Sequence, residues 1–297
     1  FFMKIIYSFS IVSSFMGLWI TSLLPETFEL FLGFILIFTF GMVHGSNDIM
    51  IVDKLSKKTN STFFIILSTY LMVVTAAILI FYFIPVLALI LFILFSAYHF
   101  GEQHWEEVLS NLSLPLQKFF FFCYGLLILF LVFLFNVEAV IKIIYEITSL
   151  ELNDIYASEV TRTLFVILFL IIAHAVYKKQ IAVKSVLKEL FSLVVFTIIF
   201  NSSSLIWGFT IYFIFWHSIP SLLDQITFIY GDLKKKSVLK YVKAAFPYWL
   251  VSLLGIVVLF LFFKEEKHFH SLFFAFIAAV TFPHAIVMLT MFSKKRI

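Results

Sequence analysis

Two kinds of residue are scarce in this 297-residue sequence: there is one cysteine, Cys123, and charged residues make up only 13%. A single thiol excludes a framework of internal disulfides and a metal cluster held by cysteines, and no CxxCH sequence is present to attach a haem. Soluble domains carry about 25% charged residues, so a chain this poor in charge cannot cover its surface in water. These absences exclude a soluble or disulfide-stabilised protein.

Apolar residues make up 63% of the chain, 42 residues are Phe, and the mean hydropathy is +1.09. About 20 consecutive apolar residues are needed to cross the hydrocarbon core of a membrane, and such runs recur along the whole chain. We therefore predict an all-α, polytopic membrane protein of about ten transmembrane helices, which forms a single integral membrane domain over residues 1–297. The predicted spans are 4–23, 28–53, 62–82, 85–103, 116–136, 160–177, 184–200, 205–228, 244–263 and 271–292. The stretch 137–159 interleaves apolar residues with charges, which indicates a helix lying at the membrane interface.

The positively charged residues predict the orientation of these helices. With ten spans, one side of the membrane receives both termini and the loops that hold all but four of the 21 Lys and Arg residues. The opposite side holds only Lys142, Arg162, Lys264 and Lys267. Because Lys and Arg accumulate in cytoplasmic loops, we expect both termini in the cytoplasm and the protein in the inner (cell) membrane. The net charge of +4 therefore reports orientation and does not indicate a nucleic-acid partner.

Four of the eight histidines lie deep in predicted spans, each on a different helix: His44, His99, His217 and His284. At a rise of about 1.5 Å per residue, His44 and His284 lie roughly 15 Å inside the basic segment that follows each of them. Polar side chains inside spans usually face the interior of the helix bundle, so these four imidazoles can converge at one level. Convergent imidazoles suit Zn, Cu, Fe or Ni. A single histidine would also be explained by an interhelical hydrogen bond, so the prediction depends on the matched depth of all four.

Two carboxylates accompany these histidines. Asp48 is four residues after His44 and Glu102 is three residues after His99, so each pair shares one face of a helix. A metal-bound histidine usually donates its other N–H to a carboxylate or carbonyl, which fixes the tautomer and the ring direction. We therefore expect Asp48 and Glu102 to orient the metal ligands, although both could instead be charges at helix ends that reach water.

The segments around the four histidines, GMVHGSND, SAYHFGEQ, FWHSIPS and TFPHAIVM, resemble the four histidine motifs of the Brp/Blh family of bacterial and archaeal membrane carotenoid dioxygenases. The resemblance covers about residues 40 to 288. It implies oxygen-dependent central cleavage of β-carotene into two retinals at an iron ion held by His44, His99, His217 and His284. Family members often carry a second histidine four residues after the third-motif histidine, where this sequence has Ser221. His104 also stands where an acidic residue is expected, and it is a reserve ligand.

From this resemblance we predict a carotenoid cleavage dioxygenase whose Fe(II) is bound by the four histidines, with no catalytic residue beyond the metal site. The carotenoid would enter from the lipid bilayer and O₂ would be the second substrate. Aromatic residues beside the motifs could line a substrate tunnel: Tyr98, Phe100, Trp105, Trp216 and Phe282. Two alternatives stay open. A related oxidase could act on another carotenoid or on lipid chains, although the HxxxH and HxxHH clusters of di-metal oxidases are absent. A metal or proton transporter could use the same histidines as a relay.

Overall fold

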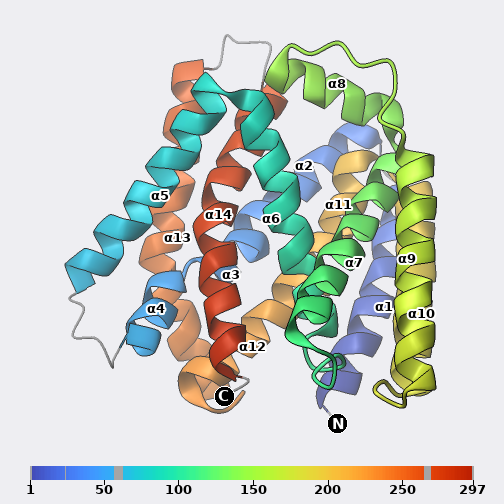
Figure 1. Cartoon of the computed structure of the whole chain (residues 1–297). Helices are drawn as coiled ribbons and strands as arrows, with labels where there is room; N and C mark the ends of the chain where they lie inside the picture. Colours follow the sequence, from blue (N-terminus) through green and yellow to red (C-terminus); the bar gives the residue numbers. More distant parts are fainter. Residues whose placement is uncertain (1, 24, 57–62, 264–268, 296–297) are drawn as a thin grey trace. The chain divides into compact units, whose positions relative to one another are not determined.

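A computed structural model describes residues 2–23, 25–56, 63–263 and 269–295, and no strand occurs among them (Figure 1). The helices are α1 (Phe2–Thr21), α2 (Glu26–Leu36), η1 (Ile37–Gly41), α3 (Met42–Gly45), α4 (Asp48–Ser56), α5 (Phe63–Phe83), α6 (Pro85–Trp105), α7 (Leu114–Phe135), α8 (Val137–Thr148), α9 (Ala157–Tyr177), α10 (Val183–Asn201), α11 (Leu205–Tyr212), η2 (Phe213–Ser218), α12 (Ile219–Tyr230), α13 (Lys235–Phe263) and α14 (Phe269–Lys295). The elements labelled η are π-helical turns. The prediction of an all-α polytopic membrane protein is confirmed.

Every predicted span coincides with one of these helices or with a run of consecutive helices. Within the described residues, eight runs are long and apolar enough to cross a membrane. The other two are α1, whose described apolar part Ile5–Thr21 is short, and α10, which carries Lys184, Lys188 and Glu189. The predicted number of about ten is therefore approximate, while the order of the spans agrees with the structure; α13 begins at Lys235, nine residues before the predicted start of its span.

Two of the spans are interrupted by a wide turn. The run from residue 26 to residue 56 consists of α2, the π-helical turn η1, α3 and α4, with a break at Ser46 and Asn47. The run from residue 205 to residue 230 contains η2 between α11 and α12. Short π-helical segments inside α-helices occur frequently at functional sites. His44 follows η1 by three residues, and His217 lies within η2.

The chain folds into two compact units, which are described separately. The first comprises the described residues of 1–34, 93–145 and 150–217. In it, α7 packs against α9, α10 and α11. The backbones of α6 and α7 touch: a Cβ atom added to Gly101 would overlap with the carbonyl oxygen of Phe121, and one added to Gly125 would overlap with that of Ala97. Small residues allow membrane helices to approach this closely, so the two glycines fix the position of α6.

The second unit comprises the described residues of 35–92, 146–149 and 218–297. Its α14 packs against α3, α4, α5 and α13. One buried apolar cluster joins α4 to the C-terminal part of α14 through Met288 and Met291. Another joins α5 and the start of α6 to α14 through Ala278, Ala279 and Phe282. His284 lies between these two clusters along α14, so apolar packing on both sides fixes its position.

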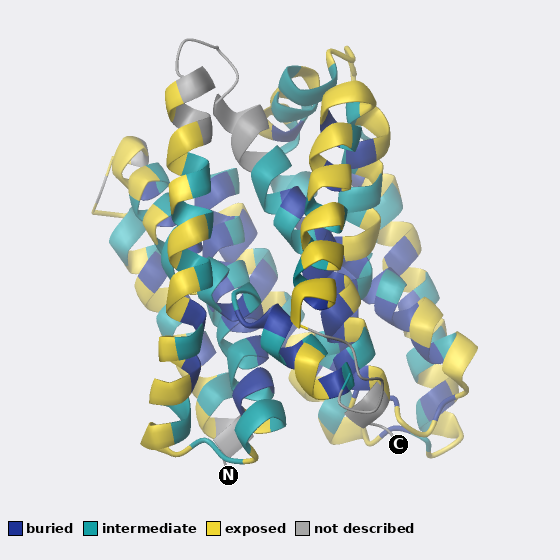
Figure 2. Cartoon of the chain, turned by 90° about the vertical axis from the view of Figure 1, so that its left-hand side faces the viewer, coloured by how far each residue is buried: buried dark blue, intermediate teal, exposed yellow. Residues whose placement is uncertain are grey.

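Large apolar side chains are exposed along several of the spans. In α5, Phe64, Tyr82 and Phe83 are 77%, 79% and 71% exposed, and α9 presents Phe169 and Leu170 in the same way. Figure 2 shows exposed residues following one side of individual helices and buried residues following the other. Contiguous apolar surfaces of this kind mark contact with a partner or a membrane, and here they agree with helices that face lipid. The amphipathic α8, within the predicted interfacial stretch, runs crosswise to α7 and α9 (Figure 1).

Candidate metal centre

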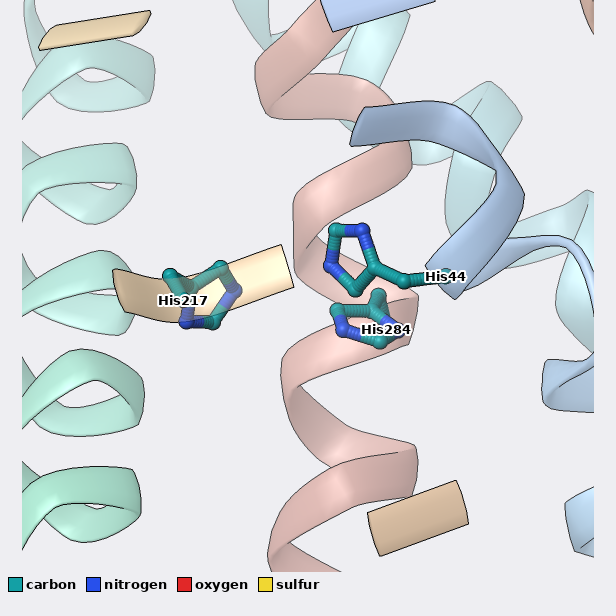
Figure 3. Close-up of side chains that lie close together, drawn as sticks. All are labelled: His44, His217 and His284. Carbon is teal, nitrogen blue, oxygen red and sulfur yellow. The ribbon is translucent and has the colours of Figure 1, made fainter. Parts of the chain in front are cut away.

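The second unit brings His44 and His284 together. His44 belongs to the short helix α3, and His284 follows Pro283 inside α14. Their ring centroids are 4.7 Å apart with the ring planes at 88°, and a ring nitrogen of each lies within 4.8 Å of one from the other (Figure 3). Both side chains are buried. Two imidazoles with this spacing suit neighbouring ligands of one metal ion.

Asp48 contacts the second of these histidines. Its Oδ1 lies 2.9 Å from Nδ1 of His284, and its Oδ2 accepts a hydrogen bond of 3.0 Å from the hydroxyl of Tyr70. The carboxylate is 1% exposed. A carboxylate at Nδ1 keeps the proton on that nitrogen, which leaves Nε2 of His284 as the atom that can bind a metal. Asp48 was expected to orient His44; the structure places its carboxylate against His284, because the break at Ser46 and Asn47 separates Asp48 from the helical turn of His44.

A buried polar network holds the backbone at His44. The hydroxyl of Tyr241 donates to Oε1 of Gln225 at 2.6 Å and lies 3.2 Å from the carbonyl oxygen of His44. Gln225 in turn donates from Nε2 to Oγ of Ser221 at 3.2 Å, and Asn47 donates to the carbonyl oxygen of Tyr241. Ser221, the position at which family members often have histidine, is therefore a fully buried member of a network that leads to His44.

The first unit holds a second pair, His99 and His217, with the same geometry. Their ring centroids are 4.7 Å apart with the planes at 86°. The ring of Phe100 stands edge-on to His217 at 4.7 Å and Phe213 stacks against it at 5.4 Å, while Nε2 of Gln103 donates to its carbonyl oxygen at 2.9 Å. Aromatic side chains therefore pack against the ring of His217, and the side-chain amide of Gln103 binds its backbone in the π-helical turn. Figure 3 also labels His217, which is the last residue of the first unit.

The remaining polar residues named from the sequence lie in the first unit. Glu102 is 2% exposed, so it is not a helix-end charge in water, and Oε1 lies 3.5 Å from the hydroxyl of Tyr98. His104 is five residues beyond His99, and its Nδ1 lies 3.2 Å from Oε2 of Glu189. His104 therefore contacts a carboxylate on α10.

The five aromatic residues proposed for a substrate tunnel have different surroundings. Phe100 contacts the His217 ring, whereas Trp105 packs against Phe120 and Tyr124. Trp216 donates from Nε1 to Oγ of Ser14 at 2.8 Å, and Phe282 stacks on Phe81 in the apolar cluster of α14. The ring of Tyr98 stands edge-on to that of Phe121. Of the five, Phe100 is the one placed directly against a candidate ligand by these contacts.

Several residues that contact the site were not named from the sequence. Tyr70, Gln225 and Tyr241 are polar side chains within spans whose contacts involve residues far away in the sequence, and no local spacing indicates them. Glu189 could have been found, because a carboxylate inside a predicted span is rare and usually functional. Gln103 adjoins Glu102 in the second motif, but its contact with the His217 backbone depends on the wide turn of η2.

The donor set of each pair fits a transition metal. Each pair offers two buried imidazoles and no thiolate, and imidazole suits Fe, Zn, Cu and Ni. Asp48 contacts His284 at Nδ1, and a metal would bind through the other ring nitrogen, Nε2. A metal held by neutral imidazoles keeps most of its charge and can leave coordination positions open for substrate.

The comparisons with known proteins agree with this reading. No curated protein and no solved structure matches the chain. The family model described as Beta-carotene 15,15'-dioxygenase matches residues 35–292, which include all four motifs. This chain belongs to that family of membrane carotenoid dioxygenases.

Proposed function

We propose that the protein is a non-haem iron dioxygenase that cleaves the central double bond of β-carotene and releases two molecules of retinal. The observation that carries this proposal is the pair of buried, edge-on histidines found in each unit, at the positions of the four motifs. In the overall reaction one carbon–carbon double bond breaks, and each oxygen atom of O₂ enters one aldehyde.

The proposed ligands of one Fe(II) ion are His44, His99, His217 and His284. One feature supports equivalent roles for the two pairs. The pairs share the same centroid distance and ring angle. His284 would bind through Nε2, because Asp48 holds the proton at its Nδ1.

The residues of the chain orient the ligands and exclude water. Fe(II) bound to neutral imidazoles supplies the one-electron chemistry that O₂ needs to react with a carbon–carbon double bond. Asp48 fixes the ring of His284, and Tyr70 fixes Asp48 by donating to its other oxygen. Phe100 and Phe213 enclose the ring of His217 and keep water from it. A dry site protects a reactive polyene from side reactions.

The substrate route is proposed to be lateral. The candidate ligands lie within membrane spans, and large apolar side chains cover the outer sides of neighbouring helices. A carotenoid dissolved in the inner membrane would therefore reach the site from the bilayer. We propose that Phe100, which contacts the His217 ring, also contacts the polyene, and that Tyr98, Trp105, Trp216 and Phe282 line the tunnel. We further propose that both termini are cytoplasmic and that Glu102, buried beside His99, supports the ligands.

The test combines metal analysis with a colour assay. Cells that accumulate β-carotene should bleach when the protein is expressed under oxygen, and they should gain retinal or retinol. Alanine at His44, His99, His217 or His284 should abolish bleaching and lower the iron that copurifies. His174→Ala is the matched control, because His174 is an exposed histidine on α9. Full activity in two of the four variants would contradict the four-ligand site, and persistent colour with iron-loaded protein would contradict the substrate.

A further inference from the structure

We propose that the first nine residues of α13 bind the headgroup of an anionic phospholipid at the membrane surface. The helix begins at Lys235, whereas its predicted span begins at residue 244, so α13 extends beyond the apolar segment. That extension, residues 235–243, contains four lysines and no acidic residue. All four lysines are exposed. The proposal concerns the second unit alone and does not depend on the proposed dioxygenase reaction.

Three of these lysines form a lysine stripe on one side of the helix: Lys236, Lys240 and Lys243. They are separated by four and by three residues, the spacing that places side chains on one face of an α-helix. The same face continues along the span through Leu250 and Leu254, which are 38% and 55% exposed. A positively charged surface is therefore followed by an apolar surface along one side of one helix, which complements the headgroup and the acyl chain of an anionic phospholipid.

The opposite side of these helical turns is buried. Tyr241 and Ala245 are 0% and 1% exposed and form an apolar cluster with Ile226 of α12. This packing fixes the side of α13 that points outward, which is the side of the lysine stripe. At about 1.5 Å per residue, the stripe extends about 10 Å along the helix. That length is close to the thickness of one headgroup layer, about 5–8 Å.

The lysines do not stabilise the helix that carries them. Positive charge is unfavourable at a helix N-terminus, because the macrodipole is positive there, and Lys235 and Lys236 lie in the first turn of α13. Lys236 and Lys240 are also a like-charge pair four residues apart, which destabilises a helix. Local choices that oppose the fold are expected at functional sites. The positive charge therefore indicates a partner of negative charge.

That partner is not a side chain within the described ranges, because no carboxylate there forms an ion pair with the lysine stripe. The acidic residue of the preceding turn, Asp232, accepts hydrogen bonds from the backbone N–H of Lys234 and the hydroxyl of Ser237. Its other oxygen lies 3.8 Å from Nζ of Lys234. A cluster of lysines directly beside a membrane span attracts anionic lipids, and the ammonium group of lysine binds phosphate as a point charge.

The test is thermal melting of the purified full-length protein in detergent micelles, with added phosphatidylglycerol or phosphatidylcholine. Phosphatidylglycerol at about ten times its dissociation constant should raise the melting temperature by roughly 3–6 °C, because it binds the folded state. High salt should remove most of this shift, since exposed charges are then screened. Phosphatidylcholine carries no net charge and should have little effect.

Replacing the stripe by glutamine tests whether these lysines bind the lipid. The triple variant Lys236→Gln, Lys240→Gln and Lys243→Gln should lose the shift caused by phosphatidylglycerol. In phosphatidylcholine it should melt at or above the temperature of the unmodified protein, because repulsion between like charges is removed. The triple arginine variant at the same positions keeps the charge and should keep the shift.

A matched control removes the same charge from the exposed turn between α9 and α10, through Lys178→Gln, Lys179→Gln and Lys184→Gln. It should respond to phosphatidylglycerol as the unmodified protein does. An equal loss of the shift in this control would mean that net charge alone attracts the lipid. A shift retained by the triple glutamine variant would place the lipid elsewhere, and an equal shift with inorganic phosphate or phosphatidylcholine would mean that a free anion or an acyl chain suffices. Each of these results overturns the proposal.

Discussion

Substituting Asp48 by Asn tests the link between the carboxylate and the metal site. Asn keeps the size and shape of Asp but removes its charge. To keep the bond to Nδ1–H of His284, the Asn oxygen must face that ring, which turns its NH₂ group toward Tyr70. Tyr70 then has to accept a hydrogen bond in place of donating one. The fold should persist, while the hydrogen bond that orients the His284 ring should weaken.

The magnitude follows from the two hydrogen bonds of Asp48. A hydrogen bond to a charged group contributes about 1.5–3 kcal/mol, and one between neutral groups contributes about 0.5–1.5 kcal/mol. The loss of about 1–1.5 kcal/mol corresponds to a roughly tenfold decrease in iron affinity. This is the lower end of the roughly 10–100-fold range for loss of a group that orients a ligand. Asp48→Ala should approach the upper end, because the His284 N–H then loses its acceptor.

The assay is a competition between the purified protein and a soluble chelator for Fe(II) under reducing conditions. Asp53→Asn is the matched control, because Asp53 is an exposed carboxylate on the same helix, α4. Thermal melting of each variant reports whether the fold is intact. If Asp48→Asn and Asp48→Ala both bind iron as tightly as the unmodified protein, the carboxylate has only a packing role and the reasoning is refuted.

The packing of α6, the polar network at His44 and the membrane topology can each be tested by one change. Gly101→Ala should prevent folding, because the added methyl group meets backbone that cannot move, whereas Gly255→Ala, with open space around it, should melt like the unmodified protein. Tyr241→Phe should destabilise the protein by about 1–3 kcal/mol, because Gln225 loses its buried donor; an unchanged melting temperature would contradict this. A reporter fused after residue 297 should be cytoplasmic and one inserted near residue 153 should not, and the reverse result would overturn the orientation.

The length and order of the helices could be predicted because the membrane imposes one simple rule. Each span needs about 20 apolar residues, and polar or proline-containing breaks mark where a span ends. Composition does not indicate wide turns, however. The run from 26 to 56 reads as one hydrophobic segment, yet it contains η1 and a break at Ser46 and Asn47. A π-helical turn depends on packing against other helices, which the local pattern does not contain.

The same limit explains what was found and what was missed at the candidate site. The four histidines were recognisable because ionisable residues inside spans are rare. The partner of Asp48 was not, because the rule that residues four apart share a face holds only within an unbroken helix. The break at Ser46 and Asn47 ends that helix between His44 and Asp48. The contact with His284 joins residues 236 positions apart, and no local spacing reports it.

The π-helical turn η2 also sets the rotational phase of the helix that carries His217. A π-helical turn accommodates one more residue than an α-helical turn, and each residue of an α-helix turns the chain by about 100°. If the same residues closed to regular α-helical geometry with none removed, His217 would rotate by about 100° relative to α11. The imidazole would then leave the side on which Phe100 and His99 meet it. The wide turn itself is therefore as strict a requirement as the identity of the histidine.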